Sequence, residues 1–223
     1  MDYGKEFQAY YTKHLGKPSS HLDYFSHQIQ SSMTPYILEE RQMNVTVMDV
    51  FSRLMMERII WVAGEVNDHM STIVQAQLMF LDSLDNLDIT MHIDSPGGSV
   101  KSGLSMVDVM DYINSDIRTI NTGMAASMGS VLLGAGTKGK RGSLRFSRTM
   151  LHQSSGGAGG NIQDARITFQ EWEKVNDTLF ELLGGYCGKS AEQVKSDASR
   201  DLWLGADEAL SYGIIDEIVK KKK

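Results

Sequence analysis

Ser127 lies within a string of small residues, T-G-M-A-A-S-M-G, that runs from Thr122 to Gly129. Its neighbours two positions away, Ala125 and Gly129, are small enough for the sharp strand-to-helix turn that exposes a nucleophilic hydroxyl. A helix starting there would aim free N–H groups and its positive dipole end at a developing oxyanion. The string therefore makes Ser127 a candidate nucleophile. Taken alone, it fits a close helix contact built from alanine and glycine even better.

A second string, D-S-P-G-G-S, runs from Asp94 to Ser99 directly after an expected strand. Proline presets a turn, and two glycines let the backbone approach another group closely. A ligand oxygen, a phosphate or a plain tight turn would each explain this pattern. On its own the string favours the plain turn.

His152 ends the string T-M-L-H and precedes a glycine-rich segment. A histidine at a strand end can act as a general base near neutral pH, although a hydrogen-bonded surface histidine is the commoner case. His92, on the polar face of its strand, is the one serious competitor. His69 opens a helix, and the other three histidines lie among the first thirty residues.

The composition excludes several classes of function. The net charge of −6 gives no basic footprint for nucleic acid, and the lysines at 220–223 fit a solvated chain end. No H-E-x-x-H string occurs, and one cysteine, Cys187, cannot build a thiolate metal site or an internal disulfide. We expect no metal, a reducing compartment and a cytoplasmic protein, because no secretory signal opens the chain and the apolar stretch 123–136 is too short to span a membrane. A hydrolase built from these residues would use covalent catalysis by serine.

The elements that must position these residues follow from hydrophobic periodicity. Residues 58–66 predict a buried strand, 68–84 an amphipathic helix, 89–94 an alternating strand and 99–113 a second helix. Within the first helix, Ile73, Ala76, Met79 and Phe80 recur at helical spacing and predict its buried face. Short strands alternating with helices indicate an α/β core with parallel crossovers.

The two ends of the chain differ from this core. Residues 1–31 are polar and aperiodic, and we expect a leader that is removed or disordered, followed by a single domain over 32–223. An arm is predicted at about 154–188, because the glycine-rich stretch from Gly156 to Gly160 precedes a long helical run, 162–183. On that run, four apolar residues recur at turn spacing and form a stripe: Trp172, Val175, Leu179 and Leu183. We expect this stripe to be too apolar to remain exposed to water.

Six strings occur in one order over residues 33–219: I-D-S-P-G-G, G-M-A-A-S-M-G, A-G-T-K-G-K-R, R-T-M-L-H-Q, S-R-D-L-W-L-G-A-D-E-A and Y-G-I-I-D-E-I. In this combination the chain resembles the caseinolytic (ClpP) family of serine peptidases. The resemblance implies a ClpP/crotonase-type α/β core with a protruding arm, or handle, made of a strand and a long helix. It also implies hydrolysis of peptide bonds in unfolded polypeptides.

The resemblance also implies a role for individual residues. It makes Ser127 the nucleophile, His152 the general base and Asp201 the group that orients the base. Spacing alone does not choose Asp201 over Asp164, Asp177 and Asp197. The backbone N–H groups of Gly98 and Met128 match the family's oxyanion hole, and the segment that contains Gly156, Gly157 and Gly160 would pair with an extended substrate backbone.

Partners follow from the same resemblance: two stacked heptameric rings of this chain, joined through the arm, and an AAA+ unfoldase that consumes ATP. No G-x-x-x-x-G-K-[ST] string is present, so we expect no cofactor in this chain. The sequence departs from the family at several places. Thr90 and His92 replace tyrosines of the docking strand, Ser154 replaces a proline after His152-Gln153, Asp94 replaces an asparagine, and Ser199 replaces an acidic residue.

Two other functions were weighed. An acyl-CoA hydratase or isomerase of the crotonase type would use oxyanion donors without a serine–histidine–aspartate set. A non-catalytic ring subunit would be expected to lack some of the three residues. The intact strings around Ser127, His152 and Asp201 favour the peptidase over both.

Overall fold

The computed structural model describes residues 36–41, 44–156 and 160–220. The chain divides into two compact units, Met1–Met56 and Glu57–Lys223. The expected leader, residues 1–31, lies outside the described residues, so its removal stays a prediction.

In the first unit, β1 (Tyr36–Arg41) pairs antiparallel with β2 (Asn44–Asp49), and the helix α3 (Val50–Met56) follows at once. The Asp49 carboxylate accepts hydrogen bonds from the backbone N–H groups of Phe51 and Ser52, at 2.9 and 3.1 Å. Together with the Ser52 hydroxyl, which also donates to it, these bonds lower the pKa of Asp49. Because they satisfy free N–H groups at a helix start, Asp49 fixes where the hairpin ends and the helix begins.

Within its described residues, the second unit is built on a seven-stranded sheet with the order β3-β4-β5-β6-β9, in which β6 is Gly142–Ser143 and β9 is Glu217–Ile218. In addition, β7 (Arg148–Leu151) pairs with β5, and β8 (Leu202–Leu204) pairs with β7. The strands β3 (Ile59–Ala63), β4 (Ile89–Ser95) and β5 (Ile117–Ala126) are parallel neighbours. Alternate side chains of β4 (Ile89, Met91 and Ile93) are fully buried, as their period of two predicts.

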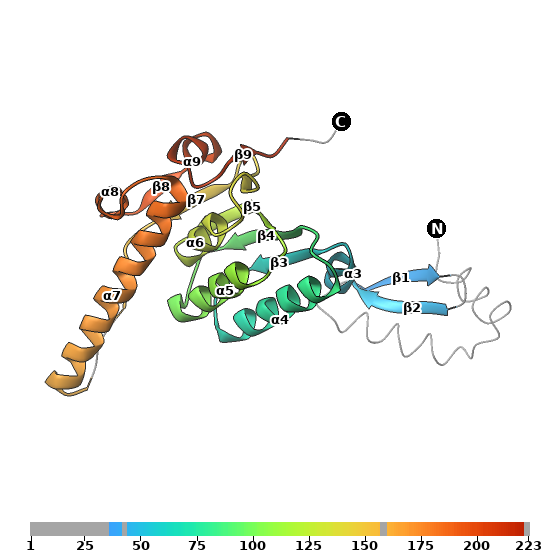
Figure 1. Cartoon of the computed structure of the whole chain (residues 1–223), viewed down its shortest axis with the longest axis horizontal. Helices are drawn as coiled ribbons and strands as arrows, with labels where there is room; N and C mark the ends of the chain where they lie inside the picture. Colours follow the sequence, from blue (N-terminus) through green and yellow to red (C-terminus); the bar gives the residue numbers. More distant parts are fainter. Residues whose placement is uncertain (1–35, 42–43, 157–159, 221–223) are drawn as a thin grey trace, which may run out of the picture. The chain divides into compact units, whose positions relative to one another are not determined.

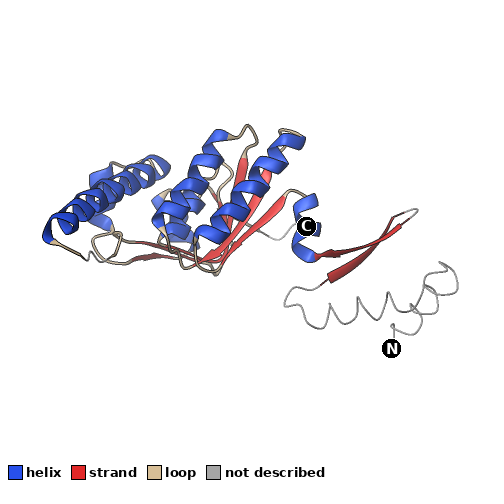
Figure 2. Cartoon of the chain, turned by 90° about the horizontal axis from the view of Figure 1, so that it is seen from below, coloured by secondary structure: helices blue, strands red, loops and turns tan. Residues whose placement is uncertain are grey.

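Two crossover helices connect these strands: α4 (Asp68–Leu84) and α5 (Val100–Tyr112). They lie side by side on the same face of the sheet (Figure 2). Each begins at a polar cap. The side chain of Asn67 accepts from the N–H of Met70 at 3.0 Å, and that of Ser99 accepts from the N–H of Ser102 at 3.2 Å. Parallel strands with helical crossovers confirm the predicted α/β core.

The predicted buried face of α4 is wrong. Ile73, Met79 and Phe80 are 43%, 51% and 51% exposed, and the helix buries Val74, Leu78 and Leu81 instead. Both sets recur at helical spacing, because the helix is apolar over more than half of its circumference. Spacing alone could not choose between them, and the packing of α4 on the sheet decides.

The remaining elements of the second unit complete the sheet, add α6 beside α5, and form the arm (Figure 1). It comprises α6 (Met128–Gly134), β6 (Gly142–Ser143), β7 (Arg148–Leu151), α7 (Ile162–Cys187), α8 (Ala191–Asp197), β8 (Leu202–Leu204), α9 (Ala206–Tyr212) and β9 (Glu217–Ile218). The long helix α7 projects away from the sheet and ends at Gly188, whose φ of 66° lies in the left-handed region that favours glycine. The expected protruding arm is present as this helix.

The apolar stripe predicted for α7 is only partly exposed. Leu179 and Leu183 are buried in the same chain, where α7 packs against α6. Trp172 and Val175, the other two members of the predicted stripe, are half-buried. Ile162, Ile167 and Phe169, which lie outside that stripe and nearer the helix N-terminus, are 76%, 63% and 53% exposed. The predicted stripe is therefore mostly covered within the chain, and the exposed apolar side chains of α7 are different residues.

Candidate active site

Ser127 lies between the end of β5 and the start of α6, with a backbone φ of 54° and ψ of −124°. A positive φ is uncommon for a residue with a side chain and marks a sharp turn. The turn is packed tightly: a Cβ on Gly97 would lie 2.6 Å from the Cβ of Ser127, and one on Gly129 would lie 2.9 Å from the backbone oxygen of Ser95. The small residues around Ser127 are therefore needed to form an exposed strand-to-helix elbow.

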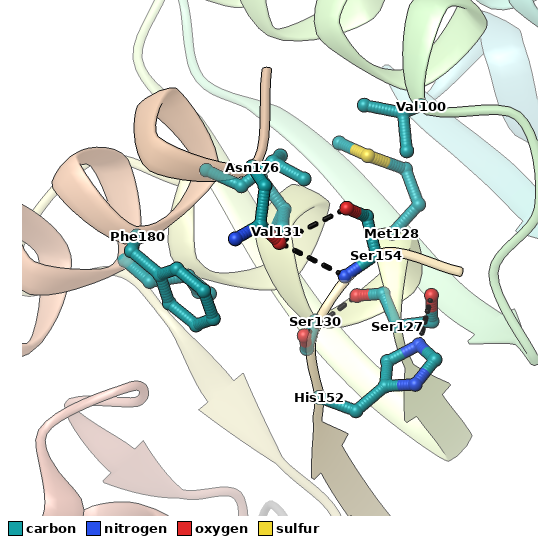
Figure 3. Close-up of a pocket in the computed structure, with 11 residues that line it drawn as sticks. Val100, Ser127, Met128, Ser130, Val131, His152, Ser154, Asn176 and Phe180 are labelled. Carbon is teal, nitrogen blue, oxygen red and sulfur yellow. Dashed lines mark hydrogen bonds between the residues drawn. The ribbon is translucent and has the colours of Figure 1, made fainter. Parts of the chain in front are cut away.

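His152 reaches the serine because two parallel strands end together. β5 pairs with β7 through Ala125↔Thr149 and Ala126↔Met150, and the Ser127 N–H donates to the Met150 oxygen at 2.9 Å. The residues that follow the two strands lie at the same edge of the sheet. The His152 ring faces the Ser127 hydroxyl, with 2.8 Å between Nε2 and Oγ (Figure 3). A proton can pass between these two atoms.

Asp201 approaches the other ring nitrogen of His152. It directly precedes β8, which pairs antiparallel with β7 through Leu151↔Leu202, so the aspartate lies beside the histidine. Its Oδ1 is 3.8 Å from Nδ1, and its side chain is 62% exposed. That separation suits attraction between charges but is too long for a hydrogen bond. The structure brings all three residues together. Ser127 and His152 are within hydrogen-bond distance, whereas His152 and Asp201 are not.

The other candidate aspartates have different partners. Asp177 forms an ion pair with Lys195 at 2.8 Å, Asp197 accepts a hydrogen bond from the Tyr212 hydroxyl at 3.0 Å, and Asp164 accepts one from Asn161. Among these four, only Asp201 is recorded within ion-pair distance of His152. Of the four aspartates that spacing left open, Asp201 is thus the one that lies beside His152, and its role stays a prediction.

The competing histidine and the cysteine lie in other settings. His92 is on β4, where its ring stacks on Trp61 with 4.9 Å between ring centres. Its partial burial, together with the charge of Arg118, lowers its pKa. Burial raises the pKa of Cys187 to about 11, which keeps the thiol protonated and weakly nucleophilic at neutral pH. Ser127 therefore remains the candidate nucleophile.

Two backbone N–H groups belong to residues at or beside the elbow. Within the described residues, neither the N–H of Met128, which opens α6, nor that of Gly98 donates a backbone hydrogen bond. Gly98 has a φ of 147°, and a Cβ there would lie 2.3 Å from the oxygen of Val66, so only glycine fits. Gly97, directly before Gly98, packs against Ser127. The assignment of these two N–H groups to an oxyanion hole stays a prediction.

A pocket opens beside Ser127 and His152 (Figure 3). Its apolar wall is formed by the first residue of α5, by α6 and by α7: Val100, Met128, Val131, Leu179, Phe180 and Leu183. Ser130, Ser154 and Asn176 add polar groups. The sequence assigns Leu179 and Leu183 to the apolar stripe of the arm and gives no signal that singles out Asn176 or Phe180. Their spacing on one face of a helix was visible, but nothing in the sequence shows that this face turns towards the serine.

The glycine-rich segment is described in part. Gly156 and Gly160 belong to no helix or strand in this single chain, and Gly160 has a φ of 97°, whereas Gly157 lies outside the described residues. A Cβ on Gly156 would lie 2.7 Å from the Trp172 ring. The pairing of this segment with a substrate backbone stays a prediction.

In the part of the chain that the structure describes, no group of three histidine, cysteine, aspartate or glutamate side chains is arranged to hold a metal ion. Within the same part of the chain, the helices are too short or too polar to cross a membrane.

Comparisons with known proteins identify the family of the chain. The family model described as Clp protease matches residues 40–222. A Bacteroides fragilis protein named ATP-dependent Clp protease proteolytic subunit is 50% identical over 218 residues, which cover 97% of this chain and 99% of that protein. Proteins of the same name from Porphyromonas gingivalis and Bacteroides thetaiotaomicron are each 48% identical, over 98% and 97% of this chain and 99% of their own lengths.

Proposed function

The chain belongs to the Clp protease family, and we propose that it is the proteolytic subunit of an ATP-dependent protease, with Ser127 as nucleophile, His152 as general base and Asp201 as the residue that orients the base. The observation that carries the proposal is the elbow: Ser127 stands at a positive φ with its hydroxyl 2.8 Å from the imidazole of His152. Serine-type hydrolysis of peptide bonds is the activity of the chain.

In the proposed reaction, His152 Nε2 takes the proton of the Ser127 hydroxyl while Oγ bonds to the carbonyl carbon of the substrate. The carbonyl oxygen becomes an oxyanion and accepts hydrogen bonds from the N–H groups of Gly98 and Met128. By analogy with measured losses of one such donor, each contributes ~3 kcal/mol to the transition state. The imidazolium then protonates the leaving amine, and a water molecule, activated by the same histidine, releases the acyl group.

Asp201 has to move closer for its role. An aspartate that orients an imidazole accepts a hydrogen bond from Nδ1–H, which requires about 2.7–3.2 Å. The 3.8 Å between Nδ1 and Oδ1 must therefore shorten by roughly 1 Å. Contacts of active sites are often long without substrate and tighten on binding. Asp201 is exposed and directly precedes a three-residue strand, so little packing opposes the small displacement that would form this hydrogen bond.

The relatives' name describes a subunit of an ATP-dependent protease, so the chain works in an oligomer with an ATPase partner. We propose two stacked heptameric rings of this chain, fed with unfolded polypeptides by an AAA+ unfoldase in the cytoplasm. Ile162, Ile167 and Phe169, exposed along the outer part of α7, support a contact between rings through the arm. Because covalent catalysis by serine needs no cofactor, we propose that ATP is consumed by the partner alone.

A fluorophosphonate probe tests the proposal, because it bonds to the Oγ of an activated serine. We expect labelling of Ser127 alone in the assembled protein, and loss of peptide hydrolysis in Ser127→Ala with the oligomer unchanged by native mass spectrometry. A label on Ser95, Ser99 or Ser130 instead, or full peptidase activity in Ser127→Ala, would overturn the assignment.

A further inference from the structure

The backbone that carries His152 is held by regular structure on one side only. β7 ends at Leu151, and residues 152–156 form neither helix nor strand. Beyond the ring of His152 itself, the next hydrogen bonds along this segment come from Ser154. Its backbone N–H and its hydroxyl both donate to Oδ1 of Asn176, at 3.0 and 2.9 Å. One acceptor therefore holds both donors of a residue two positions after the histidine.

Asn176 belongs to α7 and lines the same pocket as Ser127 and His152 (Figure 3). One turn further along the helix, Leu179 and Phe180 are buried in the core, so this part of α7 is firmly anchored. In Figure 3 the oxygen of the Asn176 amide is turned towards Ser154, while its nitrogen points towards Phe180. The amide thus connects a fixed helix to the irregular segment that follows the histidine.

We propose that Asn176 is a positioning residue for the reaction: by holding Ser154, it keeps the imidazole of His152 within hydrogen-bond distance of Ser127. The inference rests on the proposed function, in which these two residues are base and nucleophile. Without the two bonds to Asn176, the described segment after Leu151 would lack an anchor up to Gly156. The imidazole would then spend less time aligned with the hydroxyl.

The requirement for Asn176 depends on the residue at position 154. A proline there, the usual residue in the family that the sequence resembles, has neither an N–H nor a hydroxyl to donate. Proline instead fixes its own φ and restricts the residue before it, which here is Gln153. A chain with proline would hold the segment by its own stiffness. This chain has serine and holds it through a partner on α7.

The effect should appear in the chemical step. A misplacement of 1 Å can slow a reaction by about 100-fold. An imidazole that is only loosened still occupies the correct position part of the time, so the rate should fall by less than that. We therefore expect Asn176→Ala to lower kcat, and the rate at which a fluorophosphonate acylates Ser127, by about tenfold, with KM changed by less than about twofold. Alanine favours helices more than asparagine does, so α7 and the fold should persist.

Two variants bracket this result. Asn176→Asp keeps an acceptor oxygen in the same place and should restore most of the acylation rate at alkaline pH. Its added carboxylate, in the same pocket as His152, favours the charged form of the imidazole and should shift the acidic limb of the pH–rate profile to higher pH. Thr178→Ala removes a hydrogen bond on the same helix, from the Thr178 hydroxyl to the Lys174 oxygen, and should leave the rate unchanged.

The decisive experiment compares acylation rates in four assembled proteins: the wild type, Asn176→Ala, Ser154→Pro and the double variant. We expect a tenfold effect of Asn176→Ala when residue 154 is serine and an effect of less than about twofold when it is proline, because interacting residues are not additive. An equal loss in both backgrounds, no loss in either, or a Ser154→Pro protein that cannot be acylated would overturn the inference. A wild type not labelled at Ser127 would instead refute the proposed function.

Discussion

Gly97 and Gly64 form a matched pair for testing how tightly the elbow is packed. Both have a positive φ, 93° and 85°, which disfavours any residue with a Cβ. An added Cβ at Gly64 would meet nothing within 4 Å. At Gly97 it would lie 2.6 Å from the Cβ of Ser127, 2.7 Å from the oxygen of Ala126 and 2.9 Å from the nitrogen of Met128. Replacing each by alanine therefore separates backbone strain from a collision with the site.

The expected magnitudes differ because only Gly97 touches Ser127, the proposed nucleophile. Alanine in the left-handed region costs about 1–2 kcal/mol, so both variants should lose about 2–8 °C in Tm. At Gly97, carbon atoms normally stay about 3.5–4.0 Å apart, so the turn after β5 must shift by about 1 Å. That shift displaces the Ser127 hydroxyl and the Met128 N–H together. A misplacement of 1 Å costs roughly 100-fold, and loss of one oxyanion donor roughly 100- to 1,000-fold.

The assay is kcat for a short fluorogenic peptide, measured on assembled protein beside the unfolding midpoint. We expect Gly97→Ala to lose at least about 100-fold in kcat and Gly64→Ala to stay within about threefold of the wild type. Near-normal kcat in a folded Gly97→Ala protein would refute the reasoning that its Cβ displaces the elbow. A loss as large in Gly64→Ala would show that strain, rather than contact with Ser127, is responsible.

Two further predictions concern assembly and pH. Phe169→Glu places a charge on the exposed apolar end of α7 and should raise the dissociation concentration of the oligomer about 10- to 100-fold, because burying such a side chain contributes about 1.5–3 kcal/mol. Gln170→Glu adds the same charge at an exposed polar position and should have little effect in native mass spectrometry, and equal effects would contradict an interface there. Desolvation raises the pKa of Asp216, but the bidentate ion pair with buried Arg141, together with hydrogen bonds from the backbone N–H groups of Arg141 and Gly139, holds that pKa below its ordinary value of 3.8. Its stabilisation is present above about pH 4 and lost as the pH falls through the folded-state pKa, so Asp216→Asn should unfold more easily at pH 7 and show a flatter acid limb in denaturant titrations.

Hydrophobic periodicity predicted the helices and strands whose pattern fits only one type of element. The helix at residues 68–84 was predicted with the bounds observed for α4, and the alternation of Ile89, Met91 and Ile93 predicted β4. It could not identify the buried face of α4, because two sets of apolar side chains fit helical spacing. The same limit applies to α7, where Leu179 and Leu183 turn towards the core and Phe169 turns to solvent. Which side of a helix is covered depends on what packs against it.

The parts of the candidate site that could be predicted are those encoded in short, continuous stretches of sequence. The elbow around Ser127 requires small neighbours, and those are visible in the sequence. Asn176 was not predicted, because its role arises from a contact with Ser154 across 22 positions of the chain. An asparagine on a long helix has no local signature for this. The serine at position 154, where a proline would donate no hydrogen bond, was the one signal that could have prompted a search for a partner.

The long distance between Asp201 and His152 follows from the position of each of the three residues in the sheet. Ser127 and His152 follow adjacent parallel strands, and the Ser127 N–H donates to the strand that carries the histidine, so the sheet fixes their separation. Asp201 precedes β8, a three-residue strand that pairs only with β7 among the described residues. A residue at such an edge can shift without disturbing the core. The separation of Ser127 and His152, the proposed nucleophile and base, is therefore set by the fold of one chain, whereas Asp201, the proposed orienting residue, occupies the position of the three that is most easily adjusted.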